Sequence, residues 1–344
     1  MMDLSVVKNY LRQYDASDIH IMEVCGSHTA AIRKLGIQSL LSEHIHLISG
    51  PGCPVCVTAS SYIDKLLQLA KEGKCIVTFG DLIRVMGSQS SLSIEKGKGA
   101  RVEMVYSPFD IVKMAKSQPD TEFIFAAIGF ETTTPIYALL LEQIITENIK
   151  NVQFLTALKT MPPVIEYLCA LDAPIDGFLA PGHVSVVTGS DIFIPIAKKY
   201  QIPFGVAGFS GEELLTAIYG IVKARGKGRV MNFYPSVVHA KGNQKAQECV
   251  QKYFVKTDAA WRGMGIILGS GLKIREEYSI YDAGSVDLTE DKKSNLACKC
   301  DEVLMGKILP VQCPLYKKVC SPLNPQGACM VSSEGSCHAY YING

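Results

Sequence analysis

Short apolar runs alternate with segments of helical periodicity along most of the chain, and this alternation restricts the fold more than any other feature of the sequence. The runs are rich in Val, Ile and Phe, as buried parallel strands are. They comprise residues 44–49, 75–79, 102–106, 122–128, 152–158, 176–180 and 203–208. Amphipathic segments lie between them, such as residues 61–73, which end at a glycine. The pattern predicts βαβ units, and therefore open, mainly parallel sheets with helices on both faces.

The chain is long enough for more than one such unit. Its 344 residues, of which 48% are hydrophobic and 19% charged, predict about two or three domains of roughly 100–200 residues each. A further strand-like stretch, near Gly263 to Tyr278, could pack on either α/β unit. Six of the twelve cysteines lie after residue 297, so we expect sulfur chemistry of its own at the C-terminal end.

Charge and hydropathy exclude two classes of partner. A net charge of +1 gives no overall field for nucleic acid, and the stretches that contain Lys and Arg are short. The first residues lack the apolar core of a secretory signal, and no run reaches the roughly 20 apolar residues that span a bilayer. We therefore expect a cytoplasmic protein that binds neither nucleic acid nor membrane. In a reducing cytosol, grouped thiols are more often metal ligands or redox groups than structural disulfides.

Six unusual motifs share one position relative to the predicted strands. They are CGSHT (25–29), GPGCPVC (50–56), GDLIRVMG (80–87), GFETTTP (129–135), PGHVS (181–185) and FSGEELL (209–215). Each motif follows the carboxyl end of a predicted strand, and most precede a helix. Because ligands bind at that edge of open α/β sheets, the six loops are expected to meet in one crevice.

The first motif places Cys25 where a helix begins, with His28 three residues further on. The helix dipole and the free backbone N–H groups lower a thiol pKa at such a position, so a Cys25 thiolate could hold a soft metal. The alternative is a buried structural cysteine, with Ser27 or Thr29 acting only as a helix cap.

The second motif contains Cys53 and Cys56, two thiols separated by two residues. Such a pair can close a small disulfide or chelate a metal, and the preceding Gly-Pro-Gly exposes the loop backbone. The alternative is one half of a structural zinc site, for which Cys25 and His28 could supply the other half.

Three other loop residues are candidates with weaker signals. His183 could carry a proton, orient another group or bind a ligand, because neutral imidazole does each of these near neutral pH. Glu131 and Thr133 offer a carboxylate and a hydroxyl at a helix start. Each also has a structural interpretation: a loop histidine with satisfied hydrogen bonds, or an ordinary helix cap with Pro135 in the first turn.

One set of four C-terminal cysteines has the spacing C-x14-C-x6-C-x16-C, and it consists of Cys298, Cys313, Cys320 and Cys337. Four thiolates suit a [4Fe–4S] cluster or a zinc ion. Prolines interrupt this region and long apolar runs are few, so its fold is expected to depend on the metal. Cys329 lies outside the set, and from there it could exchange electrons or a disulfide with it.

Taken in order, these motifs resemble the HypD family of hydrogenase maturation factors over nearly the whole chain. The resemblance rests on CGSHT, GPGCPVC, FGDLIRV, SPFD (107–110), GFETTTP, PGHVS and the C-terminal cysteine pattern that includes GACMVSSEGSC and AYY. The chain departs from the family at Met86, where proline is usual, and this change removes no candidate ligand.

The resemblance implies an α/β fold in which two open, mostly parallel α/β domains flank a cleft and a small cysteine-rich domain carries a [4Fe–4S] cluster. On this chain we expect the first domain at residues 1–131, the second at 132–285 and the cysteine-rich domain at 286–344. The implied role is assembly of the Fe(CN)2CO unit of [NiFe] hydrogenases. Such a protein is a redox-active assembly factor rather than a free-standing enzyme.

The resemblance also implies partners and residue roles. The partners are a small HypC-type chaperone, whose N-terminal cysteine shares the iron, and a HypE-type protein that delivers cyanide from a thiocyanate. Cys25 matches the iron-holding cysteine and His28 its neighbour, while Cys53 and Cys56 match the redox pair. The matching cluster ligands are Cys298, Cys313, Cys320 and Cys337, and the matching cleft residues are Glu131, Thr133 and His183.

Two alternatives from other functional classes stay open on the sequence. The first is a general thiol–disulfide oxidoreductase that uses Cys53 and Cys56 and draws electrons from an iron–sulfur cluster. The second is a non-catalytic scaffold whose C-terminal cysteines bind structural zinc.

Overall fold

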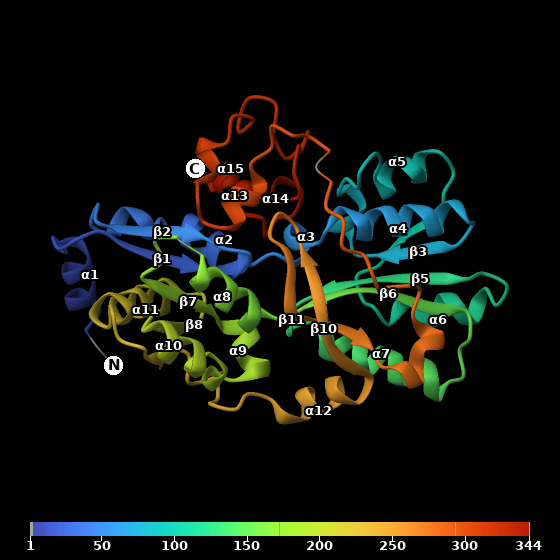
Figure 1. Cartoon of the computed structure of the whole chain (residues 1–344), viewed down its shortest axis with the longest axis horizontal. Coiled ribbons are helices and arrows are strands. Elements are labelled where there is room, and N and C mark those ends of the chain that lie inside the picture. The colour runs from blue at the N-terminus through green and yellow to red at the C-terminus, as the bar shows by residue number, and fades with distance from the viewer. Residues whose placement is uncertain (1–2, 172, 293, 344) are drawn as a thin grey trace.

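The computed structural model describes residues 3–171, 173–292 and 294–343, and it contains two β-sheets that lie side by side (Figure 1). The first sheet has the order β2-β1-β7-β8-β9, and all its strands are parallel. These strands are β1 (Ile19–Glu23), β2 (Ile45–Ser49), β7 (Gly177–Pro181), β8 (Phe204–Ala207) and β9 (Val230–Asn232).

The second sheet has the order β10-β11-β6-β5-β3-β4. Its strands are β3 (Cys75–Thr78), β4 (Val102–Met104), β5 (Phe123–Gly129), β6 (Val152–Lys159), β10 (Phe254–Trp261) and β11 (Gly265–Ile274). Four of them are parallel, whereas the hairpin β10–β11 joins β6 in antiparallel pairing.

The fold class predicted from the sequence is confirmed. Every apolar run that we expected to be a strand contains one, and both sheets are mostly parallel. The strand-like stretch near Gly263 to Tyr278 forms β11, which packs on the second sheet. The Cys-rich region is present at the C-terminal end, built from short helices and loops.

The boundary expected between residues 131 and 132 does not separate the two sheets, because it falls between β5 and β6, which are paired neighbours. The chain builds β1 and β2 of the first sheet, crosses to make β3 to β6, returns for β7 to β9 and crosses again for β10 and β11. Each sheet therefore combines segments that are distant in the sequence.

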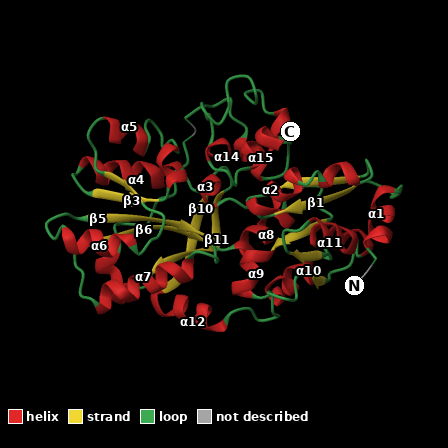
Figure 2. Cartoon of the chain, turned by 180° about the vertical axis from the view of Figure 1, so that it is seen from behind, coloured by secondary structure: helices red, strands yellow, loops and turns green. Residues whose placement is uncertain are grey.

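Helices cover both faces of the sheets, as Figure 2 shows from behind. In the N-terminal half they are α1 (Leu4–Arg12), α2 (Gly26–Lys34), α3 (Pro54–Val57), α4 (Ser60–Lys71), α5 (Leu92–Gly97), α6 (Asp110–Ser117), α7 (Thr134–Thr146) and α8 (Met161–Ala170). The remaining α-helices are α9 (Gly182–Thr188), α10 (Ile194–Tyr200), α11 (Gly211–Lys223), α12 (Gln244–Tyr253), α13 (Cys300–Leu304), α14 (Ala328–Val331) and α15 (Ser336–Asn343). Short 3₁₀ helices are η1 (Ile37–Leu40), η2 (Gly80–Arg84), η3 (Ser190–Phe193), η4 (Glu276–Tyr281) and η5 (Pro310–Gln312). Within the described residues, no helix is both long enough and apolar enough to cross a membrane.

The largest buried apolar cluster joins the first sheet to the C-terminal region. It includes Met22 of β1 and Ile48 of β2, continues through Cys56 of α3 and reaches Met330 of α14. The C-terminal region accordingly lies over the junction between the sheets (Figure 1). This placement brings its cysteines close to the loops that leave the strands.

Candidate functional site

Two cysteine-bearing loops meet at the carboxyl ends of β1 and β2. The backbone N–H of Gly50 donates a hydrogen bond to the carbonyl oxygen of Glu23 at 2.7 Å, and that of Gly26 donates to the carbonyl oxygen of Gly52 at 3.1 Å. A Cβ at Gly52 would lie 2.3 Å from the backbone nitrogen of Cys25, so only glycine permits this approach. The parallel pairing of β1 with β2 thus places the CGSHT loop directly against the GPGCPVC loop.

Cys25 precedes the first residue of α2, as the sequence predicts, but its thiol is buried. Burial raises the pKa of Cys25 to about 12, and the charge of Glu23 acts in the same direction. The backbone N–H groups of His28 and Ser27 lower the pKa but do not compensate. The lowered thiol pKa that the sequence predicts for Cys25 is therefore wrong, because desolvation raises the pKa by more than the start of the helix lowers it.

Glu23 is a buried acid beside Cys25 that the sequence analysis did not single out. Its carboxyl group accepts a hydrogen bond of 2.5 Å from the Thr29 hydroxyl and a longer one of 3.5 Å from the Cys25 N–H. Burial raises the pKa of Glu23 to about 8, so the group is mostly protonated at neutral pH. The available signal was one acidic residue within the apolar run that leads into Cys25.

Cys53 and Cys56 form a disulfide at the start of α3. The Cys53 sulfur also accepts a hydrogen bond from the backbone N–H of Cys56 at 3.2 Å. Both residues are buried, and Cys56 Sγ lies 3.8 Å from the carbonyl oxygen of Ala328 in α14. The pair can therefore cycle between a dithiol and a disulfide while it contacts the cysteine-rich region.

The segment after α14 covers these loops. A Cβ at Gly26 would lie 2.5 Å from the carbonyl oxygen of Glu334. The Ser332 hydroxyl donates to the Asp81 carboxylate at 2.8 Å, which ties the segment to the GDLIRVMG loop. Burial raises the pKa of Glu334, and the nearby charge of Asp81 raises it further. Loops from both sheets thus contact one short stretch of the C-terminal region.

His28 is fully buried, and its Nε2 lies 3.2 Å from the carbonyl oxygen of Ala207 and 3.0 Å from that of Gly208. Because carbonyl oxygens only accept hydrogen bonds, we assign the ring proton to Nε2. Burial lowers the pKa of His28 to about 4, so the ring is neutral at pH 7. Among the described residues, Nδ1 has no hydrogen-bond partner, which leaves an acceptor free.

His183 reaches the same place through an aromatic contact. Its ring stacks on Phe209 with 4.1 Å between centroids, and the His28 ring lies 4.8 Å from the same phenylalanine. The His183 side chain is exposed, and partial burial lowers its pKa. The loops after β1, β7 and β8 therefore converge, with one histidine buried and one facing solvent.

Glu131 and Thr133 lie at the end of β5 in the second sheet. One Glu131 carboxylate oxygen accepts a hydrogen bond of 2.8 Å from the Met161 N–H at the start of α8, and the other has no partner among the described residues. Burial raises the pKa of Glu131 to about 7. Thr133 precedes α7, and its hydroxyl donates to the Phe130 carbonyl oxygen at 3.4 Å. Within the described part of the chain, neither side chain bonds to Cys25, and Glu131 lines a separate cavity of about 630 Å³.

Of the four C-terminal cysteines expected to bind a cluster, three lie within electrostatic reach of the fourth, Cys337. Burial raises the pKa of the Cys337 thiol, and charges on Cys298, Cys320 and Cys313 raise it further. A Cβ at Gly327 would lie 2.6 Å from Cys298 Sγ, so the backbone passes close to this sulfur. Among the described residues, none of these four cysteines forms a disulfide, whereas the two other cysteines of this region, Cys300 and Cys329, form one.

These thiols fit a cluster by their chemistry. Four cysteine thiolates are the donor set of a [4Fe–4S] cluster, in which each thiolate binds a different iron atom. In the described residues, no three His, Cys, Asp or Glu side chains gather as ligands of a single metal ion. Two observations therefore favour a cluster over a single metal ion: the four cysteine sulfurs are the right donors, and three of them lie near Cys337.

Arg262 lies beside this region and was not identified from the sequence. Its Nε donates to the Thr58 carbonyl oxygen at 2.8 Å, its Nη1 lies 3.7 Å from the Asp291 carboxylate, and its Nη2 has no partner among the described residues. Burial lowers the pKa of Arg262, while the charges of Asp291 and Cys298 oppose that shift. The side chain lines a small cavity of about 40 Å³ together with Cys298 and Cys300.

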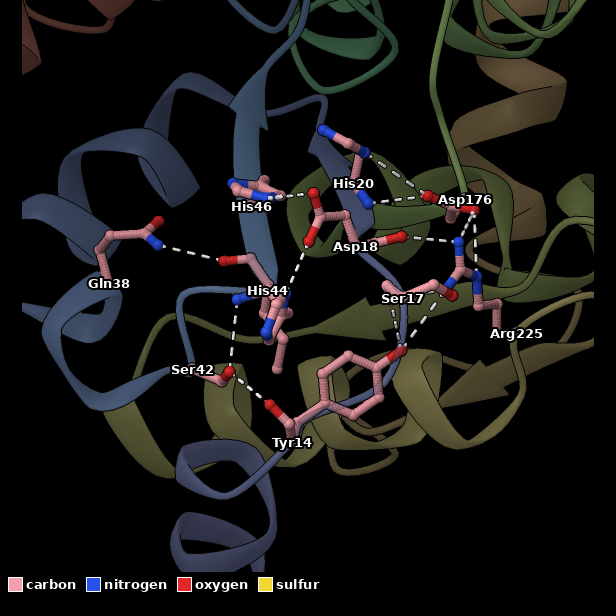
Figure 3. Close-up of polar contacts among 11 residues, drawn as sticks. Tyr14, Ser17, Asp18, His20, Gln38, Ser42, His44, His46, Asp176 and Arg225 are labelled. Atoms are coloured by element: carbon pink, nitrogen blue, oxygen red, sulfur yellow. Dashed lines mark hydrogen bonds and ion pairs between the residues drawn. The ribbon is translucent and has the colours of Figure 1, made fainter.

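A second polar cluster lies at the opposite, amino-terminal edge of the first sheet (Figure 3). His44 Nδ1 lies 2.8 Å from the Asp18 carboxylate, His46 Nε2 lies 3.7 Å from it, and the rings of His20 and His46 stack at 4.7 Å. The hydrogen bond to Asp18 raises the pKa of His44. Because these residues lie where β1 and β2 begin, the cluster is separate from the motif loops at the strand ends.

Comparison with known proteins gives consistent matches along the chain. The model of a family described as "HypD: Hydrogenase formation hypA family" matches residues 4–344. The chain is 41% identical over 334 residues to the hydrogenase maturation factor HypD of Escherichia coli K12, with 94% of this chain and 88% of the relative covered. It is 39% identical over 346 residues to the factor of the same name from Azotobacter vinelandii, with 97% and 90% covered. For the Rhizobium leguminosarum factor the identity is 39% over 361 residues, with 99% and 94% covered.

Proposed function

The chain belongs to the HypD family of hydrogenase maturation factors, and from this premise we propose that it scaffolds assembly of the Fe(CN)2CO unit of [NiFe] hydrogenases. A maturation factor acts together with other maturation proteins. We propose two of them: a small HypC-type chaperone that shares the iron, and a HypE-type protein that delivers cyanide as a thiocyanate. The cytoplasm suits this thiol chemistry because it keeps thiols reduced.

The observation that supports this function best is the contact between the Cys25 loop and the loop of Cys53 and Cys56. The hydrogen bond from Gly26 to Gly52 holds a single thiol next to a redox pair. A metal fragment held at Cys25 would therefore lie beside the residues that exchange electrons.

Cys25 is proposed to bind the iron of the Fe(CN)2CO substrate, with a second thiolate from the chaperone. Low-spin iron with cyanide and carbonyl ligands favours soft, electron-rich thiolates. Since the Cys25 thiol is protonated when no metal is bound, iron binding releases its proton. His28 lies three residues after Cys25, is neutral, and has no partner at Nδ1 among the described residues, so it is a candidate to accept a hydrogen bond that orients a ligand.

Cys53 and Cys56 are proposed to supply two electrons for cyanide release. Cleavage of the S–C bond of a protein thiocyanate to a thiol and hydrogen cyanide consumes two electrons and two protons. Oxidation of the Cys53/Cys56 dithiol to its disulfide releases two electrons and two protons, so the two half-reactions balance. The disulfide form corresponds to the state after this step.

The cluster is proposed to be held by Cys298, Cys313, Cys320 and Cys337, and when bound it supplies electrons one at a time. Cys329 pairs with Cys300 and follows Ala328, whose carbonyl oxygen contacts Cys56. This chain therefore places its two disulfides next to one another through α14. The arrangement supports re-reduction of the Cys53/Cys56 pair from the C-terminal region.

Anaerobic copurification with the chaperone tests the proposal. The wild-type complex should contain iron beyond the cluster and show infrared bands of bound CO and cyanide, together with a cluster signal in electron paramagnetic resonance after reduction. Cys25→Ala should lose the extra iron and the infrared bands and keep the cluster signal. Cys249→Ala, on α12 and apart from these loops, is the matched control.

The same sample separates the alternatives. Reduction of unrelated disulfides by the isolated chain, without extra iron and without any need for the chaperone, would favour a general thiol–disulfide oxidoreductase. Zinc in place of the cluster would favour a structural scaffold. Retention of iron and diatomic ligands by Cys25→Ala would remove Cys25 from the proposed role.

A further inference from the structure

A cavity of about 320 Å³ lies between the end of β6, the hairpin β10–β11 and the segment at residues 285–289. The hairpin forms one edge of the second sheet and lies near the centre of the molecule (Figure 1). Lys159, Asp258, Lys273 and Asp287 line the cavity together with hydroxyl-bearing residues such as Thr257. None of the six motifs lines this cavity, and the proposed assembly role assigns no function to it.

Lys159 is the unusual residue of this cavity. It is the last residue of β6 and is only 3% exposed. In the described part of the chain, no oxygen accepts a hydrogen bond or forms an ion pair with its amino group, and its nearest ring is that of Trp261, 5.5 Å from Nζ. Burial lowers the pKa of Lys159 to about 7, the charge of Arg262 lowers it further, and the charge of Asp291 opposes the shift without reversing it.

Among the described residues, Lys159 has no hydrogen bond or ion pair at contact distance, and transferring an ammonium group from water without such a contact is costly. Packing alone would be served better by an apolar side chain of similar length, such as methionine. The cavity that Lys159 lines has a volume of about 320 Å³, which gives room for a small ligand beside this side chain. Buried groups with shifted pKa values in a cavity are enriched at functional sites.

We propose that this cavity binds a small monocarboxylate whose carboxylate group is held by Lys159. Asp258 and Asp287 also line the cavity, and their negative charges disfavour a doubly charged phosphate more than a singly charged ligand. A single carboxylate, in contrast, would give the Lys159 amino group the contact partner that it lacks among the described residues. The cavity volume suits a small molecule rather than a peptide. This inference is independent of the proposed iron chemistry.

Trp261 provides a direct readout because it is the single tryptophan of the chain. Titration of the purified full chain with propionate, at constant ionic strength set with chloride, should give a saturable change in tryptophan emission. Inorganic phosphate should bind at least about tenfold more weakly than propionate, which corresponds to about 1.4 kcal/mol of repulsion. Lys159→Met should abolish the propionate response, whereas Lys273→Met, an exposed lysine on the same cavity wall, should retain it.

The pH dependence has a fixed sign. Only the protonated lysine attracts a carboxylate, so propionate should bind about tenfold more tightly at pH 6 than at pH 8, given a pKa of Lys159 near 7. Tighter binding at pH 8, equal binding by Lys159→Met, or no saturable response in the wild type would each overturn the proposal. Phosphate binding as tight as propionate binding would overturn the monocarboxylate assignment.

A second measurement uses only the wild type, so it tests the site even if Lys159→Met does not fold. An amine-reactive acylating reagent at pH 7 should modify Lys159, detected by peptide mass spectrometry, and propionate should protect this residue while Lys273 stays reactive. Equal modification of Lys159 with and without propionate would contradict the site.

Discussion

The backbone N–H of Gly26 donates a hydrogen bond to the carbonyl oxygen of Gly52, with 3.1 Å between nitrogen and oxygen. This bond joins the loop that carries Cys25 to the loop that carries Cys53 and Cys56. It depends on β1 and β2 being parallel neighbours, since only then do both loops leave the same edge of the sheet. The proposed iron ligand and the proposed redox pair are therefore positioned by backbone geometry rather than by side-chain contacts.

Gly52→Ala should separate these loops. The new Cβ would lie 2.3 Å from the backbone nitrogen of Cys25, so the backbone must shift, at a cost of about 1–3 kcal/mol of unfolding free energy. Urea denaturation of the variant measures this cost. Gly97→Ala, in the last turn of α5 where an added Cβ meets no atom within 4 Å, is the control and should be neutral or slightly stabilising. Equal stability of Gly52→Ala and the wild type would show that the loops are not in close contact.

Comparison with Glu131→Gln should show that the wild type loses unfolding free energy as the pH rises and Glu131 ionises. Because burial raises the pKa of Glu131 to about 7 from 4.5, the folded state holds its proton more tightly than the unfolded state. Stability from this group is thus fully present below pH 4.5 and is lost as pH rises through 7, by about 3 kcal/mol in total. The difference in unfolding free energy between wild type and Glu131→Gln should follow that course between pH 5 and pH 8. A difference that does not change with pH would mean that Glu131 titrates like an exposed acid.

Arg262→Met should make a bound cluster harder to reduce. The guanidinium group lies within electrostatic reach of Cys298 and is only 13% exposed, and a nearby positive charge favours the more negative, reduced state. The reduction potential, followed by electron paramagnetic resonance during an anaerobic redox titration, should become more negative. Arg84→Met is the control, because Arg84 lines the same cavity but is exposed and screened by solvent. Shifts of equal size in both variants would indicate a general charge effect.

Cys56→Ser should separate iron binding from cyanide release. The variant keeps Cys25 but cannot form the disulfide with Cys53, so it cannot deliver two electrons as a pair. Its complex with the chaperone should retain iron and lack the infrared bands of cyanide, whereas Cys25→Ala should lose both. Cyanide bands of normal intensity in Cys56→Ser would show that the pair is not the electron donor.

Much of the fold could be predicted because strands and helices leave local patterns. Runs of Val, Ile and Phe identified strands such as β5 and β6, and each motif does follow the carboxyl end of a strand, but these strands belong to two different sheets. The interleaving of the sheets could not be predicted, because pairing of β1 with β7 depends on contacts between segments distant in sequence. The boundary after residue 131 was expected from the family resemblance, and no local pattern in the sequence reveals that β5 and β6 pair across it.

The chemistry of the site was harder to predict than its position. Sequence rules for a helix start gave a lowered thiol pKa at Cys25, yet burial beneath the C-terminal segment reverses the shift. Glu23 and Lys159 escaped notice for a related reason, since each is one charged residue within an apolar strand and no motif marks it. Burial is a property of the assembled fold, so such shifts become visible only when the packing is known.

The crossing of the chain between the two sheets has a consequence for its synthesis. β1 and β2 leave the ribosome early, but their partner β7 begins only at Gly177, after the strands β3 to β6 have emerged. The edge of β1 is thus exposed for the time needed to translate well over a hundred residues, at about 5–20 residues per second. A nascent chain of this kind has reason to engage a holding chaperone before the strand order 2-1-7-8-9 can be completed.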